Sequence, residues 1–251
     1  MERAMKKYAI LGLILTMPLA SAKTDVMKEA YKEYSESELC YFATKETESG
    51  TNQYCVSLYA NEAVPNEEQE GHYKTYYLAV GDNFEKAHVL QGNIGLIIED
   101  NGEGFESNVI AQELFIDAGS SGYAPVDYQF RKIGFNSYGF VTETGYMGQG
   151  VSQGGIMIVG DHNGKIFDSY IPTFYDDSSH YAGGDHEDLS DIIEGSYELI
   201  PNDQQKMYDI KITLNGHYIG TEFKDQSYLM TFDEQMQQYN IPEDYPLKAE
   251  F

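Results

Sequence analysis

The sequence predicts a mainly β protein, an antiparallel β-sandwich or barrel-like fold with a short N-terminal helix and a short C-terminal helix. Short runs rich in Tyr, Val, Ile, Phe and Thr follow one another along most of the chain, separated by Gly, Asn, Asp or Pro. Asn-Gly pairs at 101–102, 163–164 and 215–216 lie between such runs, where they favour two-residue hairpin turns. Long amphipathic helices between the runs are missing, which argues against a doubly wound α/β sheet.

Residues 1–22 have the layout of a secretory signal peptide. Arg3, Lys6 and Lys7 form a basic start, residues 8–17 are apolar, and Ala20-Ser21-Ala22 is a small-residue cleavage site. An apolar run this short does not cross a bilayer, which needs roughly 20 residues. We therefore expect removal of the signal peptide to leave residues 23–251 as a single, soluble, mostly β domain. This mature chain would be periplasmic or secreted from a bacterium and would have no transmembrane segment.

The expected elements follow in order along the mature chain. Residues 24–39 carry apolar side chains at a helical period and predict the N-terminal helix. Residues 233–239 predict the C-terminal helix, and residues 64–72 and 174–192 predict acidic loops. The predicted strands are 40–45, 53–63, 73–81, 88–99, 104–115, 126–133, 137–143, 155–160, 165–170, 195–200, 207–214 and 228–232.

The chain is strongly acidic, with a formal net charge of −25. Loss of residues 1–22 removes three basic residues and one acidic residue, which brings the net charge to −27. Such a charge keeps a protein dispersed and repels nucleic acid and anionic lipid. It attracts divalent cations or a basic protein, and a generic solvated acidic surface is the alternative.

Cys40 and Cys55 are the two cysteines of the chain. Export places them in an oxidising compartment, and their spacing is far from the C-x-x-C of redox-active pairs. The residues between them predict a hairpin in which Cys40 is opposite Cys55 and Tyr41 faces Tyr54. We therefore expect a structural disulfide.

Residues 150–154 match the G-x-S-x-G pattern of a nucleophile elbow, with Ser152 at its centre. The elbow needs a helix after the serine, whereas residues 155–160 predict a strand, so a glycine-rich connection between strands is the favoured interpretation. A trypsin-like triad is a second possibility for Ser152, but no trypsin-family motif surrounds it. Its histidine and aspartate would come from His72, His88, Asp100, Asp117 and Asp127. No catalytic residue is assigned.

The acidic loop at 174–192 is a candidate calcium site. Its hard oxygen ligands are Asp176, Asp177, Asp185, Glu187, Asp188 and Asp191. Their spacing differs from that of an EF-hand, and a solvated loop is the alternative. Zinc bound by His180 and His186 is a further possibility, without an H-E-x-x-H motif or a cysteine pair to support it.

Carbohydrate chemistry offers another possibility, because paired carboxylates could hydrolyse a glycoside. The many acidic residues single out no pair. Tyr73, Tyr76 and Tyr77 could stack on sugar rings, although tyrosines on strands usually pack within the sheet. His88, His162 and His217 stand alone in the sequence and are expected to be structural.

The stretches at 145–155 (GYMGQGVSQGG), 171–177 (IPTFYDD) and 245–248 (YPLK), together with the early cysteine pair, resemble uncharacterised exported proteins of Gram-negative bacteria. That resemblance implies export and carries no activity.

The sequence therefore predicts a non-catalytic binding or interaction protein of the bacterial envelope that favours a cationic partner. One concrete version is inhibition of a basic secreted protein such as a cell-wall hydrolase. The alternatives are an exported hydrolase, using Ser152 or paired carboxylates, and a calcium-stabilised structural module. No cofactor other than calcium is expected.

Overall fold

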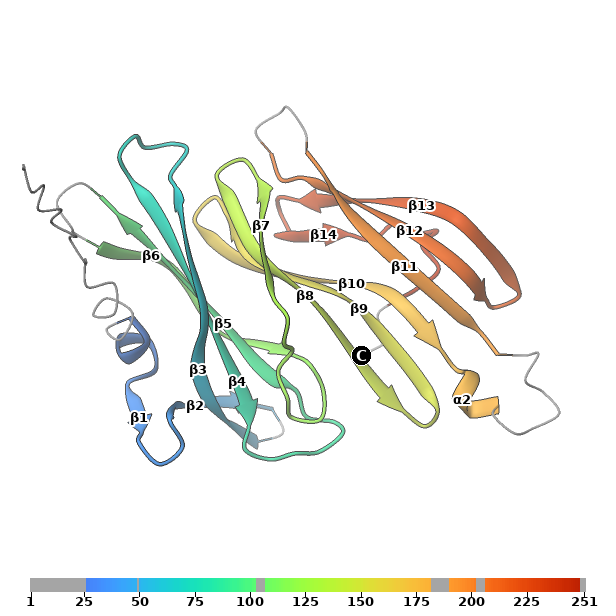
Figure 1. The fold of residues 1–251 in the computed structure, drawn as a ribbon, viewed down its shortest axis with the longest axis horizontal. Helices are drawn as coiled ribbons and strands as arrows, with labels where there is room; N and C mark the ends of the chain where they lie inside the picture. Colours follow the sequence, from blue (N-terminus) through green and yellow to red (C-terminus); the bar gives the residue numbers. More distant parts are fainter. Residues whose placement is uncertain (1–25, 49, 103–106, 182–189, 202–205, 249–251) are drawn as a thin grey trace, which may run out of the picture.

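A computed structural model describes residues 26–48, 50–102, 107–181, 190–201 and 206–248. Their strands form two antiparallel sheets in which neighbours in sequence are neighbours in space (Figure 1). The mainly β prediction is confirmed, and the arrangement is sandwich-like. Among the described residues, no helix is long and apolar enough to cross a membrane.

The first sheet runs in the order β1 to β6. Its strands are β1 (Glu33–Ser35), β2 (Cys40–Thr47), β3 (Gly50–Pro65), β4 (Tyr73–Asn83), β5 (Gly92–Asn101) and β6 (Ser107–Ala118). The second sheet runs in the order β14 to β7. Its strands are β7 (Gln129–Gly134), β8 (Ser137–Gly148), β9 (Val151–His162), β10 (Lys165–Asp176), β11 (Ile192–Ile200), β12 (Asp209–Tyr218), β13 (Thr221–Asp233) and β14 (Gln238–Asn240). The helix α2 (Ser178–Tyr181) follows β10.

The strands β8 and β9 are buried on both faces, because each contributes side chains to two hydrophobic cores. Phe140, Met157 and Val159 pack with residues of β4, β5 and β6 in a core shared by the two sheets. Val141 and Ile156, one residue away from these, point to the opposite face and join a second core. A strand turns successive side chains to opposite faces, so apolar residues at adjacent positions indicate burial on both sides. The second core lies between β8–β10 and the strands β11–β13, which extend away from the first sheet (Figure 1).

Both sheets are strongly coiled. Lys45 of β2 forms an ion pair with Asp117 of β6 at 2.7 Å. In a flat sheet these strands would be about 19 Å apart, at four spacings of roughly 4.8 Å. In the second sheet β10 pairs with β11 only through residues 174–176, and the backbone N–H of Tyr239 in β14 donates to Ser169 Oγ of β10. Each sheet therefore curls until distant strands come into contact, but no pairing between its two edge strands closes it into a barrel among the described residues.

The expected terminal helices differ from those in the structure. Residues 26–31 are helical, and Val26, Met27 and Tyr31 pack on the first sheet. The expected continuation to residue 39 is wrong, because Lys32 has a φ of 63° and the chain then enters β1. The predicted helix at 233–239 is also wrong. Asp233 Oδ1 accepts the N–H groups of Gln235 and Met236 in a turn that leads into β14.

Two Asn-Gly pairs behave differently. Asn163 and Gly164 have φ values of 50° and 72° and form the predicted two-residue turn between β9 and β10. The pair at 215–216 lies inside β12, where the pairing with β13 shifts register and Gly216 has a φ of 125°. The turn comes instead at Ile219-Gly220, with φ values of 48° and 72°. The hairpin prediction at 215–216 is therefore wrong, because the glycine permits a bulge.

Candidate functional site

The sandwich is closed at one end by a buried ion pair between the sheets. Lys74 of β4 donates from Nζ to Asp161 of β9 at 3.0 Å and to the carbonyl of Asn136 at 2.8 Å. The same carboxylate accepts the Tyr76 hydroxyl at 2.8 Å and the backbone N–H of Tyr138 at 3.1 Å. The Lys74 and Asp161 side chains are 8% and 2% exposed, so water contributes little. We call this group the inter-sheet clamp.

At the other end the two sheets separate around a hollow of about 530 Å³, the inner hollow. Met157 of β9, Asp168 and Tyr170 of β10, and Thr144 of β8 line it from the second sheet. The end of β6 and residues 88–91 line it from the first sheet. Asp168 and Tyr170 pair with Val159 and Met157, so all four occupy the face that meets the first sheet.

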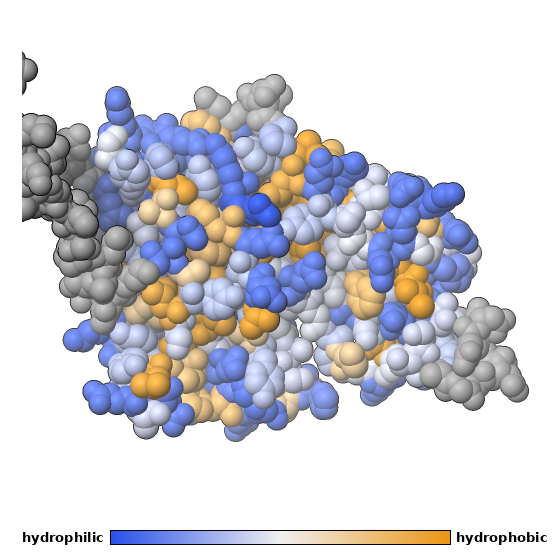
Figure 2. Space-filling view, in the orientation of Figure 1, coloured by the Kyte–Doolittle hydropathy of each residue, from blue (hydrophilic) through white to orange (hydrophobic). Residues whose placement is uncertain are grey.

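An outer hollow of about 660 Å³ adjoins the inner one and shares residues 119, 120, 144 and 145 with it. It lies between the segment 119–127 and β8, where Figure 2 shows a notch in the molecular surface. It forms because β7 pairs with β8 only as far as Val141, so the edge of β8 beyond that residue has no strand beside it among the described residues. We call the two hollows together the acidic groove.

The lining of the acidic groove is anionic and aromatic. Its carboxylates are Asp117, Asp127, Glu143 and Asp168, and its aromatic residues are Tyr123, Tyr146, Tyr170 and Tyr197. Among the described residues that line it, none is a lysine or an arginine. Carboxylates and tyrosine faces both attract cations. The groove therefore presents carboxylates at a concave surface, one of which, Asp117, is paired with Lys45.

The surroundings of Asp168 in the groove perturb its ionisation. Partial burial raises its pKa above the usual 3.8, and the charges of Glu113 and Asp117 raise it further, whereas Lys45 opposes the rise. More than a third of the residue is still open to solvent, so water reaches it inside the hollow. No hydrogen bond or ion pair joins its side chain to another described residue.

The segment 119–127 is fixed from both sides. The Gly119 N–H donates to Thr144 Oγ1, and the Thr142 hydroxyl donates to the carbonyl of Val126. On the other side, Lys86 donates to the carbonyl of Gly122 at 2.9 Å and lies 3.8 Å from the centre of the Tyr123 ring. This wall of the groove therefore already holds one ammonium group of the chain.

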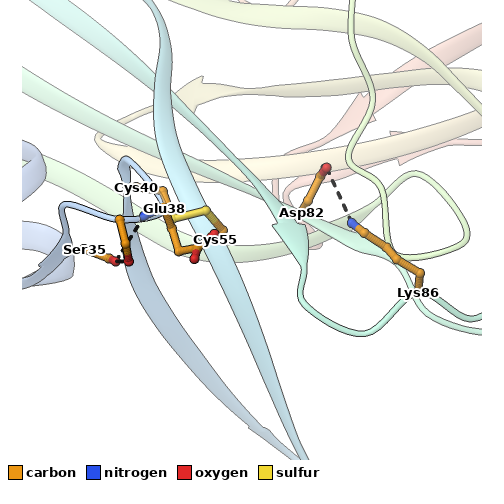
Figure 3. Close-up of a disulfide and its surroundings, with 7 residues drawn as sticks. Ser35, Glu38, Cys40, Cys55, Asp82 and Lys86 are labelled. Carbon is orange, nitrogen blue, oxygen red and sulfur yellow. Dashed lines mark hydrogen bonds and ion pairs between the residues drawn. A yellow bond between two sulfur atoms is a disulfide. The ribbon is translucent and has the colours of Figure 1, made fainter.

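The Cys40–Cys55 disulfide is present and lies beside that wall. Cys55 pairs with Asp82, which forms an ion pair with Lys86 at 3.5 Å (Figure 3) and accepts the N–H of Ala124. The expected register was wrong by two residues, because Cys55 is opposite Phe42. The hairpin turns between Thr47 and Gly50, which makes the disulfide a diagonal link between strands with a Cα–Cα distance of 5.4 Å.

Ser152 lies in β9, paired with Met147 and Asp176 and followed by strand. Gln149 and Gly150 form the preceding two-residue turn, with φ values of 55° and 81°. The local structure is therefore a hairpin and not an elbow, and no described histidine forms a hydrogen bond with Ser152.

The histidines and aspartates considered for a triad do not converge on Ser152. His72 Nδ1 lies 3.1 Å from Asp100 Oδ1, within hydrogen-bond distance. His88 and Asp117 line the inner hollow, and Asp127 lines the outer one.

The tyrosines considered for sugar stacking are not on one platform. Tyr76 is buried in the core shared by the sheets, whereas Tyr77 points to the opposite face and donates to Glu99 at 2.6 Å. Tyr73 is 52% exposed and shares the face of Tyr77 in the strand alternation, four residues away along β4. Tyr76 and Tyr77 therefore pack within the sheet.

Three members of the proposed calcium set can be placed. Asp177 Oδ1 accepts the N–H of Asp191, whose own carboxylate binds His217 and the N–H of Ile219. Asp176 accepts the N–H of Ser178. Asp185, Glu187 and Asp188, like His186 of the zinc possibility, lie outside the described residues. Within the described part of the chain, no three acidic, histidine or cysteine side chains form a group that could hold a metal.

Sequence reasoning missed a serine–histidine–carboxylate arrangement near the clamp. His162 Nδ1 lies 3.5 Å from Ser137 Oγ, and its Nε2 lies 2.7 Å from Glu234. Ser137 is 2% exposed and His162 is 5% exposed, and neither lines the acidic groove. The hydroxyl is therefore closed to a substrate in this structure. No motif could have indicated the group, because its members come from β8, β9 and the turn after β13.

Comparisons with protein-family models, with curated proteins and with solved structures found no match.

Proposed function

We propose that this chain is an exported, non-catalytic binding protein that takes a positively charged segment of a partner protein into the acidic groove. The observation that carries the proposal is the lining of that groove, with four carboxylates, four tyrosines and no described lysine or arginine. The net charge of −27 after signal-peptide removal steers a basic partner toward the surface, and the groove provides the place where it is held.

Rigidity supports this role. The clamp fixes one end of the sandwich, and the disulfide and Lys86 fix the wall at the other end. A preorganised groove loses less conformational entropy when it binds. Inhibition of a basic secreted protein, such as a cell-wall hydrolase, is a concrete form of this function in the envelope.

The test uses a fluorescent decapeptide of alternating arginine and alanine, with affinity measured by anisotropy. The groove variant carries Asp127→Asn, Glu143→Gln and Asp168→Asn. The matched variant carries Glu62→Gln, Glu68→Gln and Glu70→Gln, three exposed carboxylates outside the groove. Both lose three negative charges.

We expect the groove variant to bind at least tenfold more weakly and the matched variant to stay within twofold of the native protein. Added salt should weaken native binding. Equal losses in the two variants would show that net charge alone attracts the peptide, and would overturn the proposal.

A further inference from the structure

The inner hollow differs from the outer one in being mostly apolar. Leu90, Met157, Tyr146 and Tyr170 contribute carbon-rich surface to it. A volume of about 530 Å³ exceeds what one side chain fills, so flanking backbone can enter as well. Such a lining favours a long side chain with an apolar stem over a compact hydrated ion.

Asp168 gives this apolar hollow a charge without a counter-charge. Lys45, the cation near it, is bound to Asp117 at 2.7 Å. Glu113 and Asp117 add further negative charge around Asp168, and both of its oxygens are free of described hydrogen-bond partners. A ligand cation would therefore meet a carboxylate that is able to accept two hydrogen bonds.

Arginine matches this combination better than lysine. Its planar guanidinium donates two parallel hydrogen bonds to a carboxylate, stacks on aromatic rings and is less strongly hydrated than an ammonium group. The tyrosine and methionine side chains can pack against the flat face of the guanidinium and against the apolar stem. Asp168 can accept hydrogen bonds from the N–H groups at the edge of the guanidinium. Continuity with the outer hollow lets the backbone of the ligand pass on toward Asp127 and Glu143.

We propose that the inner hollow binds one arginine side chain of the partner segment, with its guanidinium on Asp168 and its stem between Tyr146 and Met157. This inference rests on the proposed function and names the anchor residue of that partner.

The experiment titrates isotope-labelled mature protein with the acetylated, amidated pentapeptide Gly-Gly-Arg-Gly-Gly and follows chemical shifts. A peptide with citrulline in place of arginine keeps the shape and removes the charge, and a lysine peptide keeps the charge and changes the geometry. The variants are Asp168→Asn and, as a matched loss of one charge, Glu62→Gln. The arginine–alanine decapeptide is measured in parallel.

We expect the arginine peptide to shift residues 88–91, Met157 and Tyr170, and to bind at least tenfold more tightly than the citrulline peptide. Asp168→Asn should remove that preference, Glu62→Gln should preserve it, and lysine should bind at least threefold more weakly than arginine. Equal binding of arginine and citrulline, or an unchanged preference in Asp168→Asn, would overturn the anchor. If the groove variant still bound the decapeptide more weakly than the matched variant, the proposed function would survive the failure of the anchor. If the two variants bound the decapeptide equally, the proposed function itself would be refuted.

Discussion

Removal of Lys74 should be among the most damaging single changes that the structure allows. The Asp161 carboxylate is 2% exposed in the native protein; in Lys74→Met it keeps two donors, the Tyr76 hydroxyl and the Tyr138 N–H, but loses its cation. The carbonyl of Asn136 loses a donor as well. Breaking one side of a buried ion pair typically costs about 3–5 kcal/mol, because the remaining charge is left without compensation. We expect a loss of this size in the free energy of unfolding.

The assay is urea unfolding at neutral pH. Lys211→Met is the matched control, because its pair with Glu198 is 3.5 Å long and 43% and 64% exposed. Exposed pairs contribute less than about 1 kcal/mol, so the control should unfold close to the native protein. If Lys74→Met cost no more than Lys211→Met, the clamp would not hold the two sheets together, and the account of a rigid sandwich would fail.

Four further predictions concern the disulfide, Asp168, Gly155 and the acidic loop. Replacing both cysteines with serine should lower unfolding stability by about 3 kcal/mol, as expected for closure of a loop of 15 residues, and a change under 1 kcal/mol in urea unfolding would contradict this. Asp168→Asn should raise the melting temperature at pH 7. The pKa of Asp168 is raised in the folded state, so the ionised carboxylate destabilises the fold at any pH above its unfolded pKa of 3.8. The difference in melting temperature between variant and native protein should therefore shrink as the pH falls toward 3.8. A difference that does not change with pH would refute this prediction. Gly155→Ala should cost about 1–3 kcal/mol because its Cβ would lie 2.2 Å from the carbonyl oxygen of Ile171, whereas Gly154→Ala, with its nearest atom at 3.4 Å, should be tolerated. If residues 174–192 bind calcium, excess calcium should raise the melting temperature and a chelator should reverse the rise, and no response to either would remove that hypothesis.

The sequence predicts strands at the places of β2 to β13, because β-forming runs and their separators are local signals, whereas β1 and β14 lie where helices are predicted. It failed where the outcome depends on tertiary contacts. Asn163-Gly164 and Asn215-Gly216 are the same dipeptide, yet one forms a turn and the other a bulge inside β12. The turn after β13 replaced an expected helix because Asp233 caps the chain locally.

The candidate site was less accessible to sequence reasoning than the fold. The acidity of the chain predicts a cationic partner, but the local run of carboxylates points to the acidic loop at 174–192, none of whose described residues lines the groove. Asp117, Asp127, Glu143 and Asp168 are spread over 52 residues of sequence, and only the separation of two coiled sheets brings them around one groove. No local pattern records that separation.

Hydrogen–deuterium exchange of residues 23–251 with and without the arginine–alanine decapeptide tests the central claim most directly. Backbone amides gain protection where a ligand covers them or orders their surroundings. Binding in the acidic groove predicts slower exchange in residues 88–91, 117–127 and 142–146, with little change in β12 and β13. Protection confined to other surfaces, or spread evenly over the acidic exterior, would contradict the assignment of the groove as the binding site.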